Sequence, residues 1–543
     1  MESVSIVLFL LLAVVVSGAI TRMLPFSIPT PLVQIALGAC IGLSTAHRVA
    51  LDPELFLFLF LPPLLFLDGW RIPKDELFRD LSTVVELALG LVLMTVVGMG
   101  FFIHWLIPAM PLAVSFALAA VVSPTDPIAV SAIAARVPIP KRMMHILEGE
   151  SLLNDASGLV CLRFAVAAAL TGSFSPGSAA LNFLWVAGLG ILVGVAVTIL
   201  ISHTKAWVTD RWREDSGSQI LVSLLIPFGS YLAAEHLHAS GILAAVSAGV
   251  AMTFAEASRQ TMAETRMRRN SVWDMIQFAL NGIIFVLLGE QLPGILAGAK
   301  NTVALTGHGA PAWLAFYIAA ITVGLATLRF LWVWASLKLT ILRNGRKGIG
   351  TRSPDWRLIA ATSIAGVRGA ITLAGVLTLP LLLNDGTPFP ARDLSIFLAA
   401  GVILLSLIIA SIALPILLSG LTMPSEPSVQ AEEDHARITT AEAAIQAIEQ
   451  HQHRLAQDEG EADIFAAAGA RVMGLYRERI DGLSEHQPDE RRIGERLLGE
   501  FHLVGVKAER VALARLVRTQ KVGIEIARKI TRDLDLSEAR YRM

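Results

Sequence analysis

The chain has 543 residues, of which 54% are hydrophobic and only 16% are charged, and its mean hydropathy is +0.62. Soluble globular domains usually carry about 25% charged residues, so this composition excludes an ordinary soluble protein and indicates a membrane protein. The formal net charge of −1 provides no basic face, which leaves nucleic acid without support as a partner.

Apolar windows long enough to cross a bilayer recur along residues 1–423. A membrane-spanning helix needs about 20 predominantly apolar residues, and the windows predict thirteen spans. They cover residues 4–21, 28–46, 54–70, 82–107, 111–136, 145–171, 182–203, 217–237, 240–256, 271–296, 312–341, 357–382 and 393–420. The N-terminal segment carries Glu2 ahead of the first window and lacks a basic region, so we interpret the window as a span rather than as a signal peptide.

The Lys and Arg residues of the connecting loops are distributed unevenly. Alternate loops, from the one with Arg22 to the one with Arg357, carry nearly all of them, whereas the other loops carry only Arg48, Lys300 and Arg392. Cytoplasmic loops are enriched in Lys and Arg, so the first set is predicted to be cytoplasmic. With an odd number of spans, the N-terminus then lies outside and the C-terminal tail lies in the cytoplasm.

Three predicted spans contain ionisable residues far from their ends. The fifth carries Asp126, the sixth carries Glu150 and Asp155, and the twelfth carries Arg368. Asp155 lies thirteen residues beyond Arg142, which is about 20 Å of helix in a hydrocarbon core about 30 Å thick. An ionised group at that depth costs about 2.5–3.5 kcal/mol, so these side chains are predicted to pair, bind an ion or face water.

Helical spacing divides the polar residues of the sixth span into two pairs. Residues four apart lie on the same face of a helix, so Ser151 shares one face with Asp155, and Glu150 shares the adjacent face with Asn154. We therefore expect one role for Ser151 and Asp155 and another for Glu150 and Asn154.

The fifth span contains the sequence SPTDP, in which Pro124 and Pro127 flank Thr125 and Asp126. Proline interrupts helical hydrogen bonds, and freed carbonyls at membrane depth are tolerated only inside protein or beside water. Transporters build ion sites from such broken helices, with carbonyl and carboxylate oxygens as ligands. The segment therefore predicts a cation site.

The twelfth span has a corresponding weak point, where Gly366 and Gly369 flank Arg368. If the seventh span is a linker between spans 1–6 and 8–13, the fifth and twelfth spans are equivalent partners of opposite direction. The sequence then predicts inverted repeats with two broken, crossed helices.

Structural explanations stay open at several of these positions. Asp126 and Arg368 could form a charge network that stabilises the fold without transport. Asp68, near the end of the third span, could pair only with Arg71. Arg329, in the eleventh span, could be a snorkelling or interface residue.

Three motifs together resemble those of the sodium/proton exchanger family, in the branch of the NhaP-type antiporters. They are SPTDP at residues 123–127, GESLLNDASG at residues 149–158 and GVRGA at residues 366–370, and they occur in the family's order. The resemblance covers roughly residues 1–420. It implies an all-α membrane protein with the NhaA-like antiporter fold, a dimer of thirteen-span protomers, and a mobile core that carries the ion by an elevator movement.

The resemblance also implies roles for individual residues. Asp155 would bind both the cation and the proton, and Asp155 and Asp126 would be the carboxylate ligands of the transported metal cation. Ser151 and the main chain around Thr125 would contribute to the same site. Asp68 matches in type an acidic residue that the family often has after the double proline of the third span, and its part as a ligand stays open.

A structural network is implied beside the ion site. Asn154 would stabilise the crossed broken helices, and Glu150 would form an ion pair with Arg368. Asn154 cannot titrate, whereas the related branch with Asp at this position is electrogenic. The resemblance therefore implies electroneutral exchange of one proton for one cation.

The tail, residues 424–543, is rich in charge and has apolar residues at helical spacing from Ile438 to Ile448 and from Leu497 to Ile530. This pattern predicts cytoplasmic regulatory helices that pack on one another or on a second protomer. Histidine titrates near neutral pH, so the tail histidines could form a pH sensor or be solvated surface residues. They are His435, His451, His453, His486 and His502.

We interpret the chain as a secondary active antiporter, not an enzyme, that exchanges Na⁺, K⁺ or Li⁺ for protons across the plasma membrane, the inner membrane of a bacterium. It would serve pH and cation homeostasis. No cofactor is predicted, and the expected partners are the transported ions, the lipid bilayer and a second copy of the chain. Two other classes stay open: an ion-coupled symporter of a small solute, which needs a larger polar pocket, and a cation channel or sensor.

Overall fold

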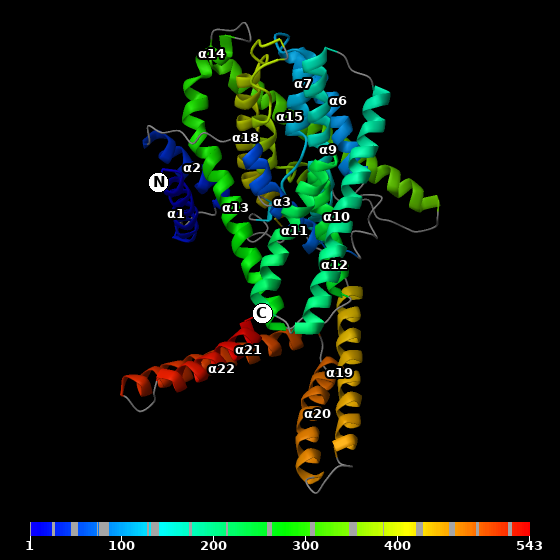
Figure 1. Cartoon of the computed structure of the whole chain (residues 1–543), viewed down its shortest axis with the longest axis vertical. Coiled ribbons are helices and arrows are strands. Elements are labelled where there is room, and N and C mark those ends of the chain that lie inside the picture. Colours follow the sequence, from blue (N-terminus) through cyan, green and yellow to red (C-terminus); the bar gives the residue numbers. More distant parts are fainter. Residues whose placement is uncertain are drawn as a thin grey trace. The chain divides into compact units, whose positions relative to one another are not determined.

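The computed structural model separates the chain into two compact units, Met1–Leu421 (unit 1) and Thr422–Met543 (unit 2) (Figure 1). In the part of the chain that it describes, nearly all residues are helical, apart from turns and one isolated β-bridge between Leu382 and Pro388. The described residues are 2–23, 28–44, 53–72, 74, 86–127, 130–131, 141–172, 176–212, 215–257, 263–304, 310–346, 356–383, 385–419, 427–455, 462–484, 488–519 and 524–542.

The helices of unit 1 follow the apolar windows of the sequence. They are α1 (Glu2–Met23), α2 (Thr30–Ser44), α3 (Pro53–Arg71), the π-helix η1 (Glu86–Leu91), α6 (Val92–Leu106), α7 (Leu112–Val122), α9 (Lys141–Thr171), α10 (Pro176–Trp212), α11 (Ser216–His236), α12 (Gly241–Ala257), α13 (Ala263–Ala297), α14 (Ala299–Ala304), α15 (Ala312–Arg346), α16 (Trp356–Ile364), α17 (Ala370–Leu377) and α18 (Arg392–Leu418).

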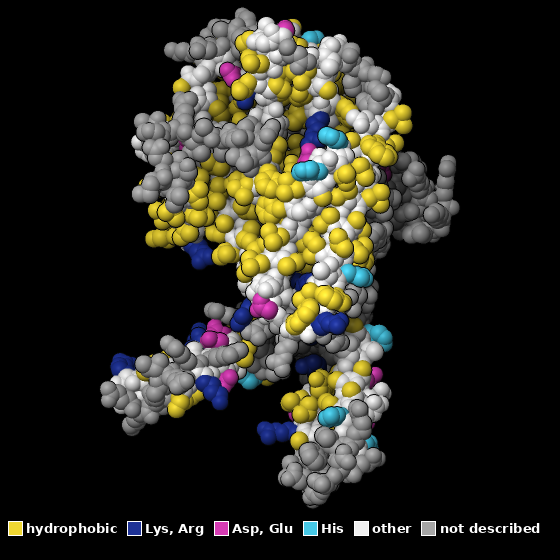
Figure 2. Space-filling view, viewed as in Figure 1, with side chains coloured by type: hydrophobic (Ala, Val, Ile, Leu, Met, Phe, Trp, Pro, Cys, Tyr) yellow, Lys and Arg dark blue, Asp and Glu magenta, His cyan; other side chains and the backbone are white. Residues whose placement is uncertain are grey.

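Several of these helices have the length and composition of membrane spans. Among the described residues, seven helices are long and apolar enough to cross a bilayer, and four shorter apolar helices accompany them. Hydrophobic side chains cover much of the visible face of unit 1 (Figure 2). On α10, large apolar side chains such as Leu184, Trp185 and Leu192 are exposed, which suits contact with lipid rather than water. A helical, multi-pass membrane protein is confirmed, whereas the number of thirteen spans stays a prediction.

Unit 1 is built from two groups of helices that pack mainly within themselves. In the first group, α2 packs on α13, and α12 packs on α3, α10 and α11. In the second group, α7 packs on α6 and α9, and α18 packs on α15, α16 and α17. Small residues allow membrane helices to approach closely, and a Cβ at Gly38 of α2 would overlap the Val286 carbonyl of α13.

Two elements of the second group are broken where the sequence predicts. The helix α7 ends at Val122, and no helix forms over Ser123–Asp126. The helix α16 ends at Ile364, and α17 begins at Ala370 after a non-helical segment. The breaks lie against each other, because the Asp126 amide donates to the Val367 carbonyl at 2.7 Å.

Unit 2 consists of two helix pairs. The helix α19 (Pro427–Leu455) packs on α20 (Ala462–Ser484), and α21 (Pro488–Arg518) packs on α22 (Ile524–Arg542). The second pair has a small apolar core of Val506, Leu513 and Leu534. The amphipathic pattern of the tail thus buries apolar residues between its own helices.

Candidate functional site

A small cavity lies where the two helix breaks meet α3, α9 and α13. Its volume is about 30 Å³. None of its described lining residues is Lys, Arg or His, and three of them are carboxylates. The polar lining residues are Asp68, Thr125, Asp126, Ser151, Asp155, Asn281 and Thr372. Several carboxylates around one cavity repel one another when ionised, so the arrangement favours the binding of a proton or a metal cation.

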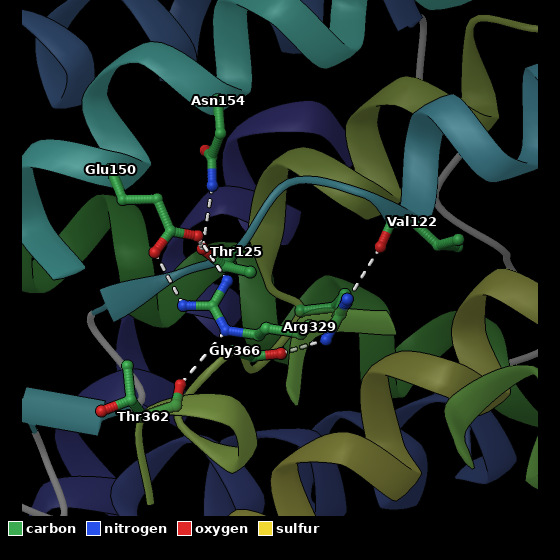
Figure 3. Close-up of polar contacts among 8 residues, drawn as sticks. Val122, Thr125, Glu150, Asn154, Arg329, Thr362 and Gly366 are labelled. Carbon is green, nitrogen blue, oxygen red and sulfur yellow. Dashed lines mark hydrogen bonds and ion pairs between the residues drawn. The ribbon is translucent and has the colours of Figure 1, made fainter. Parts of the chain in front are cut away.

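The sixth predicted span, α9, presents its two polar faces to different surroundings. Ser151 and Asp155 line the cavity. On the adjacent face, the Asn154 Nδ2 donates to Thr125 Oγ1 at 2.8 Å, and this hydroxyl donates to Glu150 Oε1 at 3.3 Å (Figure 3). The face with Glu150 and Asn154 therefore holds the α7 break, while the other face opens to the cavity.

Glu150 pairs with Arg329 of α15 and not with Arg368, so the predicted Glu150–Arg368 ion pair is wrong. The Arg329 Nη2 donates to Glu150 Oε2 at 2.7 Å, and Nη1 donates to Oε1. The two side chains are 2% and 1% exposed. Arg329 also donates from Nε to the Thr362 carbonyl of α16 at 3.1 Å (Figure 3).

The alternative in which Arg329 snorkels to the membrane surface is not what the structure contains. Arg329 lies in the middle of the 35-residue helix α15, too deep for its side chain to reach either membrane surface. The depth estimate that singled out Arg368 would have found Arg329 as well. The buried Arg329 side chain passes close to the backbone at Gly366, since a Cβ at Gly366 would overlap it.

Arg368 binds backbone carbonyls instead of a carboxylate. Its Nε donates to the Val122 carbonyl at 2.9 Å, and its Nη1 donates to the Gly366 carbonyl (Figure 3). Val122 ends α7, and Gly366 follows the end of α16. The C-terminus of a helix has unpaired carbonyls and a partial negative charge, so the guanidinium compensates two half-helix ends at once.

Asp126 lies against the N-terminus of α17. Gly369 is the residue that precedes this helix, and a Cβ at Gly369 would overlap the Asp126 carboxylate. The N-terminus of a helix carries a partial positive charge, which favours the ionised form of a carboxylate. Only glycine leaves room for the Asp126 side chain at this position.

Asp155 and Asp68, unlike Glu150, have no ion-pair partner among the described residues. Asp155 is 4% exposed and makes no hydrogen bond or ion pair with any other described residue. Asp68 lines the cavity, while Arg71 pairs with Asp274 and donates to Gln277 at 2.9 Å. The alternative in which Asp68 pairs only with Arg71 is therefore not what the structure contains.

Sequence reasoning gave no role to Asn281, which faces the cavity from α13. Its Oδ1 atom is buried and accepts no hydrogen bond within the described part of the chain. The available signal was an amide side chain within an otherwise apolar stretch of the tenth window. An amide carries no charge, so the cost of burying an ionised group does not mark this position.

Comparison with known proteins assigns the chain to a family. Residues 8–420 match the family described as "Sodium/hydrogen exchanger, transmembrane". The chain belongs to this family. The family predicted from the three motifs is thereby confirmed.

The exchanger is similar to curated relatives over nearly its whole length. It is 44% identical to the "Uncharacterized Na(+)/H(+) exchanger YjcE" of Escherichia coli strain K12, with 99% of each chain covered. It is 38% identical to the "Sodium, potassium, lithium and rubidium/H(+) antiporter" of Bacillus subtilis strain 168, with 97% of this chain and 76% of the relative covered.

The fold of the exchanger is that of a solved antiporter. The structure of the sodium proton antiporter MjNhaP1 from Methanocaldococcus jannaschii at pH 8 matches with a TM-score of 0.54 and 19% identity. The match covers 78% of this chain and 99% of that chain. The predicted all-helical antiporter fold is confirmed at this level.

Proposed function

We propose that the exchanger moves Na⁺, or K⁺ or Li⁺, across the plasma membrane in exchange for protons, with Asp155 as the group that binds either ion. The observation that carries this proposal is the cavity, in which Asp155 meets Asp68 and Asp126 without a basic side chain among the described lining residues. An uncompensated carboxylate at membrane depth is costly, so Asp155 holds a proton or a cation for most of the cycle.

The two ions compete because they need the same carboxylate. Asp126, Ser151 and the main chain around Thr125 line the cavity with Asp155 and supply the hard oxygen ligands that such cations prefer. A volume of about 30 Å³ is far below the several hundred Å³ of pockets for organic ligands. The cavity therefore favours an ion over the organic solute of a symporter.

Asp155 and Asp126 have different parts in this scheme. Asp126 keeps its charge because its carboxylate packs at the N-terminus of α17. Asp155 is buried without such a partner in the described chain. The occupancy of Asp155 therefore changes during the cycle, while Asp126 contributes a constant negative charge to the cation site. Asp68 lines the same cavity from α3 and completes the site.

An elevator movement agrees with the way the site is divided between the two helix groups. The network of Glu150, Asn154, Arg329 and Arg368 joins α7, α9, α15 and the twelfth span, all in the second group. These elements can move as one body against α3 and α13. We also infer inverted repeats, a homodimer, an N-terminus outside the cell, and a cytoplasmic, regulatory tail over residues 424–543. These inferences rest on the sequence pattern and on the family.

The decisive experiment replaces Asp155 with asparagine. Proton movement is followed in proteoliposomes after addition of Na⁺, K⁺ or Li⁺, with thermal stability of the purified protein measured in parallel. Asp155→Asn should abolish exchange and leave stability intact, while the exposed control Asp393→Asn should behave like wild type. A stable Asp155→Asn protein that exchanges at nearly the wild-type rate would overturn the proposal.

A further inference from the structure

The α13 wall of the cavity contains a polar group that the proposed cycle does not yet use. Asn281 lines the same cavity as Asp68, Asp126 and Asp155. Its amide oxygen Oδ1 is buried and has no hydrogen-bond donor among the described residues. Buried side-chain polar atoms are normally satisfied by protein or by an ordered water or ion, so this oxygen requires a partner that enters the cavity.

We propose that Asn281 is a ligand of the transported cation and supplies its Oδ1 atom from α13. This inference rests on the proposed function, because it assigns one more ligand to the same site. The amide oxygen is a hard, neutral donor of the kind that binds metal cations beside carboxylates. It lines the cavity from α13, whereas Ser151 and Asp155 line it from α9, so a cation bound in this small cavity contacts both helix groups.

Asn281 differs chemically from the carboxylates of the site. A carboxylate binds a proton or a cation, whereas a side-chain amide does not titrate in the physiological range. Asn281 therefore strengthens the binding of the cation without strengthening the binding of the proton. It biases the competition at Asp155 toward the metal ion and tunes which monovalent cation fits.

The division of ligands between the helix groups gives Asn281 a place in the cycle. Thr125, Asp126, Ser151 and Asp155 belong to the second group, and Asn281 and Asp68 belong to the first. When the groups slide past each other, the cation keeps the ligands of the second group and loses Asn281. Its contribution is thus confined to the arrangement in which α13 borders the cavity.

The experiment compares the apparent KM for Na⁺ of wild type, Asn281→Ala and the matched control Asn270→Ala in proteoliposomes. Asn270 lies on the same helix and is exposed. Asn281→Ala removes one contact between the amide oxygen and the charged cation, and this loss should raise the KM for Na⁺ about tenfold. The maximal rate, and the pH dependence measured at saturating Na⁺, should stay at the values of wild type and of Asn270→Ala.

A second variant and a second measurement keep the result interpretable. Asn281→Asp adds a titratable oxygen, so it should lower the KM for Na⁺ and change the pH dependence. Because a ligand that binds the folded state stabilises it, Na⁺ should raise the melting temperature of Asn281→Ala less than that of wild type. If Asn281→Ala does not fold, Asn281→Ser takes its place in both assays.

Two results would overturn the inference. An unchanged KM in Asn281→Ala, or a lower maximal rate at unchanged KM, would make Asn281 a packing residue. Either result is distinct from a failure of the proposed function, which would appear as exchange by the stable Asp155→Asn protein.

Discussion

Replacement of Arg329 should destabilise the exchanger strongly, because it would leave a buried carboxylate without its charge partner. Arg329 and Glu150 are 2% and 1% exposed and are joined by two hydrogen bonds. Removal of one partner of a buried ion pair typically costs about 3–5 kcal/mol. Arg329→Met should therefore lower the free energy of unfolding by about that amount, and Glu150→Leu should do the same.

The double variant tests whether the pair, rather than either residue alone, carries the effect. Glu150→Leu with Arg329→Met removes both charges, so it should recover much of the lost stability. Because the two single changes would together cost about 6–10 kcal/mol if they were additive, the coupling energy of this pair should exceed the range of about 0.5–3 kcal/mol found for most contacting residues, whereas that of Glu150 with Arg368 should lie near the lower end of that range. The contrast separates the observed partner from the predicted one.

The assay is thermal unfolding of the purified protein, with Arg163→Met as the matched control. Arg163 pairs with Glu235 at 3.1 Å, but the two side chains are 56% and 34% exposed, and exposed ion pairs contribute only about 0–1 kcal/mol. If Arg329→Met unfolds at the same temperature as Arg163→Met, or if Glu150 couples as strongly to Arg368 as to Arg329, the reasoning is refuted.

Three further results are expected. Gly369→Ala should abolish exchange, because its methyl group would overlap the Asp126 carboxylate, while Gly177→Ala, which meets no atom within 4 Å, should exchange normally. Hydrogen bonds from the Ser218 hydroxyl and nearby amides lower the pKa of Asp215, so the stability advantage of wild type over Asp215→Asn should shrink as the pH falls below about 4; an advantage as large at pH 3 as at pH 7 would contradict this. Removal of residues 422–543 should leave a folded, exchanging protein with an altered pH profile, since every cavity residue lies in unit 1; loss of exchange in a stable truncated protein would assign unit 2 to the transport cycle.

The features that were predictable from the sequence are local ones. Apolar windows depend on the composition of single segments, and the helices occupy them closely, as with 393–420 and Arg392–Leu418. The helix breaks depend on Pro124 and Pro127 in one segment and on glycines in the other, so they too were visible. Helical spacing also separated Ser151 and Asp155 from Glu150 and Asn154.

The features that the sequence did not predict depend on tertiary contacts between distant segments. Two buried arginines compete for Glu150, and the choice of Arg329 follows from the packing of α15 on α16, which brings its guanidinium to Glu150 and to the Thr362 carbonyl. The partners of Arg368 are backbone carbonyls. Every residue has a backbone carbonyl, so the residue types in the sequence do not predict these partners. Asn281 carries no charge, so its presence in an apolar window does not by itself predict a functional site.

The stoichiometry of exchange follows from which groups can change charge. Arg329 compensates Glu150, Asn154 does not titrate, and the Asp126 carboxylate packs at the N-terminus of α17, whose partial charge is positive. If, as we propose, Asp155 takes up a proton in place of a cation and neither Asp68 nor Asp126 changes its occupancy, one cycle moves no net charge. The final level of a Na⁺-driven pH gradient should then depend on the Na⁺ gradient alone.

The measurement is Na⁺-driven proton movement in proteoliposomes with an imposed K⁺ diffusion potential of either sign, under conditions in which Na⁺ is the transported cation. Each elementary charge moved against 100 mV would change the energy of a cycle by about 2.3 kcal/mol, so even partial net charge movement would displace the final pH gradient. If the final gradient follows the voltage, a second carboxylate must change its occupancy. Asp68 would be the first candidate, because it lines the cavity without a described ion pair, and Asp68→Asn should then restore voltage independence.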